Sequence, residues 1–164
     1  YCRAARMIYL NRACYNGLYR ENSKGEFNTA IGKGFNPSIM DDMIFEASKC
    51  LFDCTIKCLS FEEIADSPKS GDLVYLDPPY IPLNEYSFTK YSSSGFEDED
   101  QVKLAKMFDD LAGRGVNVIA SNSYSPRSLE LYKKHNIKSV YANRRISGDV
   151  GSRKKMKEII VTSW

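Results

Sequence analysis

The sequence Asp77-Pro78-Pro79-Tyr80 sets a carboxylate and an aromatic ring on a stiff turn. The apolar run 73–76 comes directly before it and predicts a buried strand. The two prolines end that strand, because proline has no N–H to give to a sheet. The Asp77 carboxylate and the Pro78 carbonyl can then each accept a hydrogen bond from an amine, while Tyr80 stacks on a flat ring. Such a turn suits a planar amino-base, and adenine is the natural occupant.

The competing interpretation of these four residues is a strand that ends in a proline turn with an exposed aspartate. The surrounding pattern favours the chemical interpretation, since it alternates strands with helices and so predicts an α/β sheet. Ligands bind at the carboxyl ends of the strands in such sheets, where this turn lies. Helices are expected at 1–11, 37–51, 98–114 and 126–134, and strands at 55–59, 73–77, 116–120, 137–142 and 158–164.

Shorter features complete the predicted organisation. Residues 13–36 are rich in glycine, asparagine and aromatic residues, and they indicate a β-hairpin or an ordered loop with a turn at 23–25. Ser60 and Glu63 form the pattern of a capping box for a short helix. The polar run 121–123 follows strand 116–120 at its edge.

The composition is that of a soluble globular domain, with 43% hydrophobic and 27% charged residues among 164. No apolar run approaches the ~20 residues that span a bilayer, so no membrane partner is expected. The chain begins at Tyr1 inside a helical pattern, which predicts a piece of something longer.

Charge is distributed unevenly along the chain. Residues 1–34 carry six basic and two acidic side chains, residues 37–110 six and sixteen, and residues 133–157 nine and one. Two basic ends around an acidic middle could hold a polyanion. An ordinary solvated surface is the competing interpretation.

The five cysteines do not form a recognisable metal motif. Cys50, Cys54 and Cys58 are four residues apart, a spacing that would stack them on one helix face. No CxxC pair or partner histidine accompanies them, so no metal is predicted. Small buried thiols in a reducing compartment are the favoured interpretation, in keeping with a cytoplasmic protein. His135, the only histidine, is expected at the surface.

The ordered set of these segments resembles the Dam-type DNA adenine-N6 methyltransferases, the D12 class. Segments 10–12, 15–20 and 24–28 resemble the target-recognition hairpin of that family, and 71–80 resembles its catalytic strand and motif. Further matching segments are 88–91 with Phe96, 121–123, and 144–146 through 153–155.

The resemblance implies a Rossmann-like, S-adenosylmethionine-dependent methyltransferase sheet, incomplete at the N-terminus, with a target-recognition β-hairpin insertion. Residues 1–12 would be a helix leading into the recognition region, 13–36 the hairpin, and 37–164 the C-terminal part of the catalytic α/β domain. The family also has a Gly-rich turn after its first strand, and Gly32-Lys33-Gly34 does not qualify as one. The chain therefore resembles the second part of such a methyltransferase.

The resemblance assigns the catalytic turn to residues Asp77, Pro78, Pro79 and Tyr80. Asp77 and the Pro78 carbonyl would accept hydrogen bonds from the adenine amine, and Tyr80 would stack on the extrahelical base. Asp77 would also touch the amino group of the cofactor. Phe61 would contact the cofactor adenine, although a core phenylalanine after a Ser60 cap is the competing interpretation.

The resemblance also assigns contacts to duplex DNA. Arg20 would grip O6 and N7 of a guanine, within a GATC-like site. Tyr15 would fill the gap left by the flipped base, with Asn16 and Leu18 beside it; simple packing of the hairpin is the alternative for Tyr15 and Leu18. Phosphate contacts, or merely solvated charges, are expected at Arg12, Lys24, Arg144, Arg145, Arg153 and Lys154.

Three functions remain open at this point. The leading one is an adenine-N6 DNA methyltransferase from a bacterium or phage, with no obligate protein partner. A second is methylation of another planar amine, such as cytosine N4 or a glutamine amide; those families more often have Ser or Asn before Pro-Pro-Tyr. A third is a truncated module that binds DNA without methylating it.

Overall fold

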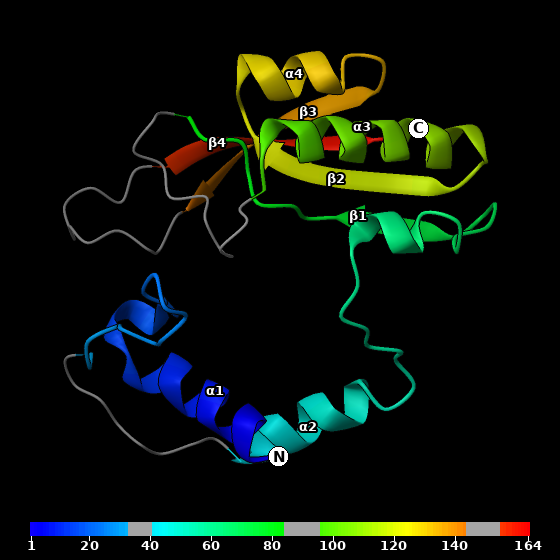
Figure 1. Ribbon diagram of the computed structural model, residues 1–164. Coiled ribbons are helices and arrows are strands. Elements are labelled where there is room, and N and C mark those ends of the chain that lie inside the picture. The colour runs from blue at the N-terminus through cyan, green and yellow to red at the C-terminus, as the bar shows by residue number, and fades with distance from the viewer. Residues whose placement is uncertain (33–40, 84–95, 144–154) are drawn as a thin grey trace. The chain divides into compact units, whose positions relative to one another are not determined.

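The computed structural model describes residues 1–32, 41–83, 96–143 and 155–164. The chain forms two compact units, Tyr1–Cys58 and Leu59–Trp164 (Figure 1). In the described part of the chain no helix is long and apolar enough to cross a membrane.

The C-terminal unit contains a mixed, open four-stranded sheet. Its strands lie in the order β1-β2-β4-β3, with β1 parallel to β2 and the other neighbours antiparallel. The bounds are β1 Leu73–Leu76, β2 Asn117–Ser123, β3 Asn136–Asn143 and β4 Lys155–Thr162. The predicted α/β class is confirmed at this level.

The described residues of this unit form three helical segments: η2 Phe61–Ile64, α3 Asp98–Gly113 and α4 Pro126–Leu131. The predicted capping box is confirmed, because Ser60 N donates to Glu63 Oε1 at 2.8 Å and Ser60 Oγ accepts from Glu62 N. Helix α3 begins with three acidic residues, which the positive end of its dipole favours. It connects β1 to β2 and lies alongside the sheet (Figure 1).

The core lies between α3 and one face of the sheet. Phe108 and Leu111 of α3 pack with Val118, Ile159 and Val161, and all five side chains are fully buried. The opposite face is more open: Leu73 and Tyr75 are 64% and 59% exposed. β1 was predicted to be buried, but only Leu76 is; β1 is an edge of the described sheet, and α3 covers one face only.

The N-terminal unit contains α1 Cys2–Ala13, η1 Tyr15–Gly17 and α2 Asp41–Cys50. The predicted hairpin within 13–36 is not confirmed as paired strands. The described residues show only two isolated antiparallel bridges, Cys14 with Ile31 and Glu21 with Phe27. The turn between Glu21 and Phe27, inside the second bridge, is held by the Asn22 side chain. Its Oδ1 accepts from Lys24 N at 2.9 Å and from Glu26 N at 3.0 Å.

Two predictions between residues 50 and 59 are wrong. Strand 55–59 does not form, and α2 ends at Cys50, so the three cysteines do not share a helix face. Cys50, Cys54 and Cys58 are exposed rather than buried. This stretch contains two residues of high strand propensity, Thr55 and Ile56, but no described neighbouring strand pairs with it, and propensity alone does not form a strand.

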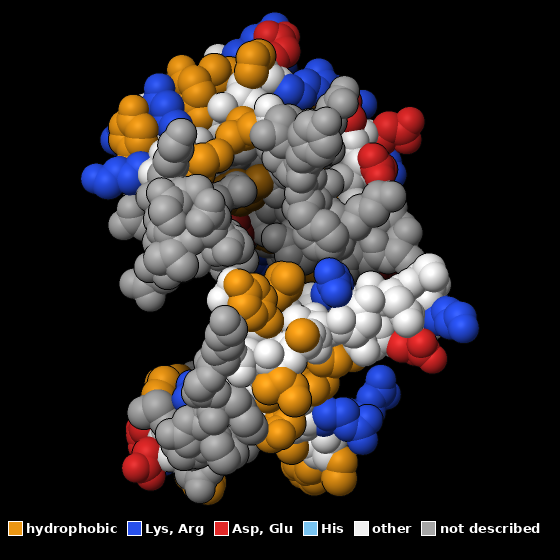
Figure 2. All heavy atoms as spheres, turned by 90° about the vertical axis from the view of Figure 1, so that its left-hand side faces the viewer, with side chains coloured by type: hydrophobic (Ala, Val, Ile, Leu, Met, Phe, Trp, Pro, Cys, Tyr) orange, Lys and Arg blue, Asp and Glu red, His pale blue; other side chains and the backbone are white. Residues whose placement is uncertain are grey.

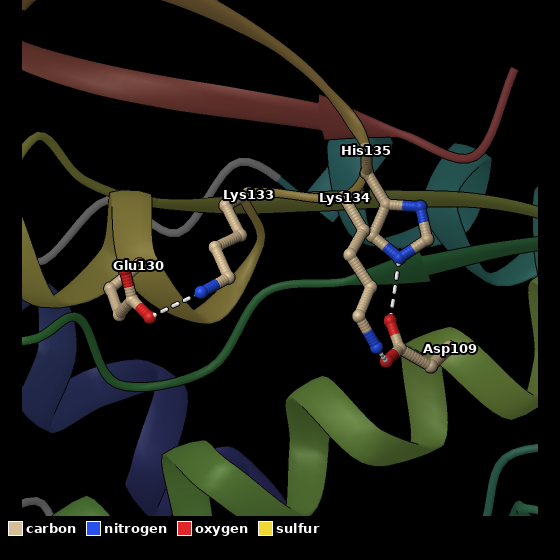
Figure 3. Close-up of polar contacts among 5 residues, drawn as sticks. All are labelled: Asp109, Glu130, Lys133, Lys134 and His135. Atoms are coloured by element: carbon tan, nitrogen blue, oxygen red, sulfur yellow. Dashed lines mark hydrogen bonds and ion pairs between the residues drawn. The ribbon is translucent and has the colours of Figure 1, made fainter.

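His135 also differs from its expected surface position. Its side chain is only 12% exposed, lies 4.5 Å from the Phe108 ring centre, and shares a 2.6 Å hydrogen bond with Asp109 Oδ1. Lys134 pairs with the other oxygen of Asp109 at 3.2 Å (Figure 3). This cluster joins the end of α4 to the outer side of α3.

Candidate active site

The Asp77 carboxylate is fixed by a neighbouring strand. β1 and β2 are parallel, with Leu76 opposite Ala120, so the next residues along them, Asp77 and Ser121, adjoin at the carboxyl edge. Ser121 Oγ donates to Asp77 Oδ1 at 2.8 Å and accepts from the Tyr75 hydroxyl at 3.0 Å. Tyr75 and Asp77 lie on the same face because they are two residues apart on an extended chain. One carboxylate oxygen is therefore held by this chain of hydroxyls.

The turn after Asp77 is held by two buried amides. Asn122 Oδ1 accepts from Ile81 N at 2.9 Å, and Asn122 Nδ2 donates to Gln101 Oε1 at 3.1 Å. Gln101 Nε2 in turn donates to the Pro79 carbonyl at 2.7 Å. Asn122 and Gln101 are 1% and 3% exposed. Residues from β2 and α3 thus fix the backbone on both sides of Tyr80.

Tyr80 lies between these two networks and is half-buried. Burial raises the pKa of its phenol, and the nearby carboxylates of Glu158 and Asp77 raise it further, against the opposing effect of a hydrogen bond with Ser121. The phenol is therefore neutral at physiological pH. A neutral ring suits stacking on a flat, uncharged base.

Two hydrogen-bond acceptors remain available at the turn. Ser121 occupies Oδ1 of the exposed Asp77 and leaves Oδ2 without a donor in the described part of the chain. Across the same residues, no N–H or O–H group donates to the Pro78 carbonyl. A carboxylate oxygen and a carbonyl one residue apart can accept the two N–H groups of one exocyclic amine.

Phe61 begins η2 and is partly buried against the core, with its ring centre 5.9 Å from that of Phe96. The packing interpretation of Phe61 therefore has direct support. Its partial exposure also leaves ring surface for a ligand. An aromatic ring can stack on the adenine of S-adenosylmethionine, and an exposed carboxylate can accept hydrogen bonds from its amino group, so Phe61 and Asp77 fit the cofactor chemically.

The predicted DNA-contacting residues that the structure describes lie in the N-terminal unit. Arg20 is exposed, and Asn28 fixes its guanidinium by two contacts: Nε to Asn28 Oδ1 at 2.9 Å and an Nη to the Asn28 carbonyl at 3.1 Å. The remaining N–H groups of this fork have no acceptor in the described part of the chain. Arg12 and Lys24 are exposed as well.

Tyr15 starts the short helix η1 and is 43% exposed. Asn16 and Gly17 follow with φ of 54° and 67°, a left-handed conformation that asparagine and glycine tolerate best. A side chain at Gly17 would come within 3.2 Å of the Asn11 carbonyl. Leu18 is half-buried. Arg144, Arg145, Arg153 and Lys154 lie outside the described residues.

Sequence reasoning missed four residues that position the others: Tyr75, Gln101, Asn122 and Asn28. The run 121–123 was noted as a strand edge and as a matching segment, without a role for any of its side chains, and β2 includes it. The signal for Gln101 was a polar residue at a core-facing position of an amphipathic helix. Asn28 belongs to the matching segment 24–28, but nothing in the sequence indicated its contact with Arg20, because that contact depends on the turn that brings the two residues opposite each other.

A parallel strand edge that presents Asp-Pro-Pro-Tyr, fixed by amides from an α/β core, is the arrangement expected of an amino-group methyltransferase. Residues 1–146 match the family described as D12 class N6 adenine-specific DNA methyltransferase. The chain belongs to this family, as its sequence predicted.

Relatives support the same conclusion. The chain is 47% identical to the type II methyltransferase M1.LlaDCHI of Lactococcus lactis subsp. cremoris, over 99% of this chain and 58% of that protein. It is 44% identical to the type II methyltransferase M.MjaIII of Methanocaldococcus jannaschii, over 99% of this chain and 57% of that protein. It is 33% identical to the DNA adenine methylase of Escherichia coli strain K12, over 96% and 57%. The chain thus spans somewhat more than half the length of these relatives.

Proposed function

We propose that this chain is the catalytic and DNA-reading part of an enzyme that methylates N6 of adenine in duplex DNA, with S-adenosylmethionine as the methyl donor. The observation that carries the proposal is the pair of acceptors at the turn, Asp77 Oδ2 and the Pro78 carbonyl, on a backbone held by Asn122 and Gln101. Family membership supports the same substrate class.

The turn at residues 77–80 has the groups that this methyl transfer requires. Adenine N6 is a weak nucleophile because its lone pair is delocalised into the ring, and positive charge grows on it during methyl transfer. A carboxylate and a carbonyl on the two N–H groups stabilise that charge, and a fixed turn supplies the stabilisation without reorganisation. The cofactor, when bound, supplies an electrophilic methyl group on sulfonium. Tyr80 stacks on the base and holds it in line.

The target adenine has to leave the duplex to reach Asp77. Tyr15, presented on η1 beside two left-handed residues, is the side chain that fills the vacated space, and Asn16 and Leu18 flank it. Phe61 and Asp77 are the residues of this chain that contact the cofactor adenine and amino group.

Arg20 reads a guanine of a GATC-like site. One edge of the Arg20 guanidinium donates to Asn28, so the remaining N–H groups of Arg20 are fixed in direction before DNA binds. A fixed fork pairs with O6 and N7 of guanine at low entropic cost. Arg12 and Lys24, with Arg144, Arg145, Arg153 and Lys154, supply phosphate contacts, which add affinity without sequence information.

We assign residues 1–36 to target recognition, with residues 1–12 leading into it, and 37–164 to the catalytic domain. A cytoplasmic location in a bacterium or in a phage-infected host follows from a duplex DNA substrate.

The test is methylation of a GATC-containing duplex by the complete protein that the gene encodes. We expect tritium from methyl-labelled cofactor to appear in N6-methyladenine, and Asp77→Ala to abolish it. Asp66→Asn, at an exposed aspartate away from the turn, is the matched control and should leave the rate unchanged. Cofactor binding without methylation of adenine in any duplex would overturn the proposal and favour a DNA-binding module. Label in N4-methylcytosine would identify the other substrate.

A further inference from the structure

Three residues form a row across the carboxyl edge of the sheet. The β3–β4 register places Tyr141 opposite Lys157, and Tyr124 N, just after β2, donates to the Lys157 carbonyl at 3.2 Å. Lys157 therefore has Tyr124 on one side and Tyr141 on the other, each from a different chain segment. Tyr141 is 70% exposed and Tyr124 37%. Figure 2 views this end of the sheet and shows basic side chains beside hydrophobic ones on the C-terminal unit.

Lys157 is distinguished from the other lysines of this unit by its partner. Its Nζ lies 3.7 Å from the ring centre of Tyr124. Lys103, Lys133 and Lys134 are each paired with a carboxylate. No described acidic side chain pairs with Lys157, or with Lys69, Lys106, Lys138 and Lys155, so the ring contact is what sets Lys157 apart. A cation over a ring keeps its full charge, and the contact restricts a long side chain that would otherwise lose entropy on binding.

The strand β4 separates charge by face. Glu158 is opposite Ser123, and by alternation it lies on the face of Ser121 and Asp77, the residues beside the candidate amine-binding turn. Lys157 lies on the opposite face, between the two tyrosines. The acidic face suits an amine, and the basic row suits an anion.

We propose that Tyr124, Lys157 and Tyr141 bind phosphates of the DNA backbone outside the target base pair. This inference rests on the proposed function. Lysine and tyrosine are both regular phosphate donors, and a sheet-mounted row is rigid. Two strand spacings and three residue rises separate Lys157 from Asp77 by about 14 Å. At about 3.4 Å per base pair, the row lies roughly four base pairs from the flipped adenine, beyond a four-base site.

The test compares DNA affinity in the complete protein over a series of salt concentrations. Lys157→Gln should weaken binding to a duplex of about 30 base pairs several-fold and reduce the salt slope by about one. Tyr141→Phe, which removes only a hydroxyl at a highly exposed position, should weaken binding less. The matched control is Lys138→Gln, because Lys138 is an exposed lysine on β3 that lies on the opposite face.

A duplex of about six base pairs centred on the target extends only about three base pairs to either side and so lacks the flanking phosphates; it should bind the Lys157→Gln and unmodified proteins equally. Equal affinities and slopes for Lys157→Gln and Lys138→Gln on the long duplex would overturn the inference. If methylation by the unmodified protein proceeds, that result leaves the proposed function intact. Absence of methylation with an intact Lys157 effect would instead overturn the proposed function while DNA binding by the row stands.

Discussion

Ser121 donates a 2.8 Å hydrogen bond to Asp77 from the neighbouring parallel strand, and it accepts one from Tyr75 on Asp77's own strand. Ser121 and Tyr75 thus set the orientation of the Asp77 carboxylate, which carries the proposed chemistry. Positioning of this kind predicts effects on turnover rather than on folding.

Ser121→Ala should lower kcat by roughly tenfold, because one hydrogen bond to a charged group is worth about 1.5–3 kcal/mol and only part of it acts on the transition state. KM for the cofactor should change less, and the free energy of unfolding should change by no more than about 1 kcal/mol. Ser121→Thr, which retains the hydroxyl, should restore most of the rate. Steady-state kinetics on the unmodified protein and the two variants tests this prediction. Equal kcat for Ser121→Ala and the unmodified protein would contradict it.

The amide pair predicts a loss of stability. Asn122→Ala leaves the Ile81 N–H and one end of Gln101 without a partner in a buried site, which costs about 1–3 kcal/mol of unfolding free energy. Asn117→Ala, at an exposed asparagine on the same strand, should change it by no more than about 0.5 kcal/mol. Denaturant titration measures the free energy of unfolding of both variants. Equal unfolding midpoints for Asn122→Ala and Asn117→Ala would show that the two amides do not hold the turn.

Arg20 and Lys24 should behave differently towards DNA sequence. Asn28→Ala removes the side-chain contact to Arg20 Nε and leaves only the backbone contact, so it should loosen the Arg20 fork and reduce discrimination against a replaced guanine by part of the roughly 1–3 kcal/mol that a bidentate contact supplies. Lys24→Gln should weaken binding to all duplexes alike. Competition binding with single-base variants of GATC separates the two. Uniform loss in Asn28→Ala would show that Arg20 contacts phosphate instead.

Asp109 predicts a specific acid dependence of stability. Burial alone would raise its pKa, but the hydrogen bonds from His135 and Lys134 outweigh burial and the pKa is lowered. Its contribution is therefore fully present above the unfolded carboxyl pKa, about 3.9, and is lost as the pH falls through the lower folded value.

Asp109→Asn should consequently be less stable than the unmodified protein at pH 6, and the gap should narrow as the pH falls below the unfolded carboxyl value. Asp66→Asn, at an exposed aspartate without an ion pair among the described residues, serves as the control. Thermal unfolding across this range tests the sign. A gap that widened on acidification would mean that the pKa is raised.

Local patterns predicted what local physics determines. The proline turn after β1, the capping box of Ser60 and the acidic start of α3 each depend on residues within a few positions of one another. The family resemblance was recoverable for the same reason, since its motifs are short and ordered along the chain.

Local patterns could not predict the residues that hold the site in place, because these residues lie far from the turn in the sequence. Gln101 reaches Pro79 across 22 positions, and Ser121 reaches Asp77 across 44. The strand predicted at residues 55–59 was wrong for a related reason. The composition of this segment is typical of a strand, but a strand forms only against a partner strand, which sequence spacing does not reveal.

The two buried amides also form a line with a fixed direction. The N–H groups of Ile81 and Ser123 both point at Asn122 Oδ1, so Asn122 has to offer its NH₂ to Gln101, which then has to offer its own NH₂ to Pro79. Conversion of Asn122 to aspartate, a change of one atom at constant shape, would set oxygen against oxygen at Gln101. Gln101 could restore a hydrogen bond to residue 122 only by rotating its amide by half a turn, which would point its oxygen at the Pro79 carbonyl. Deamidation at this single position would therefore be transmitted along the line to the backbone that carries Tyr80.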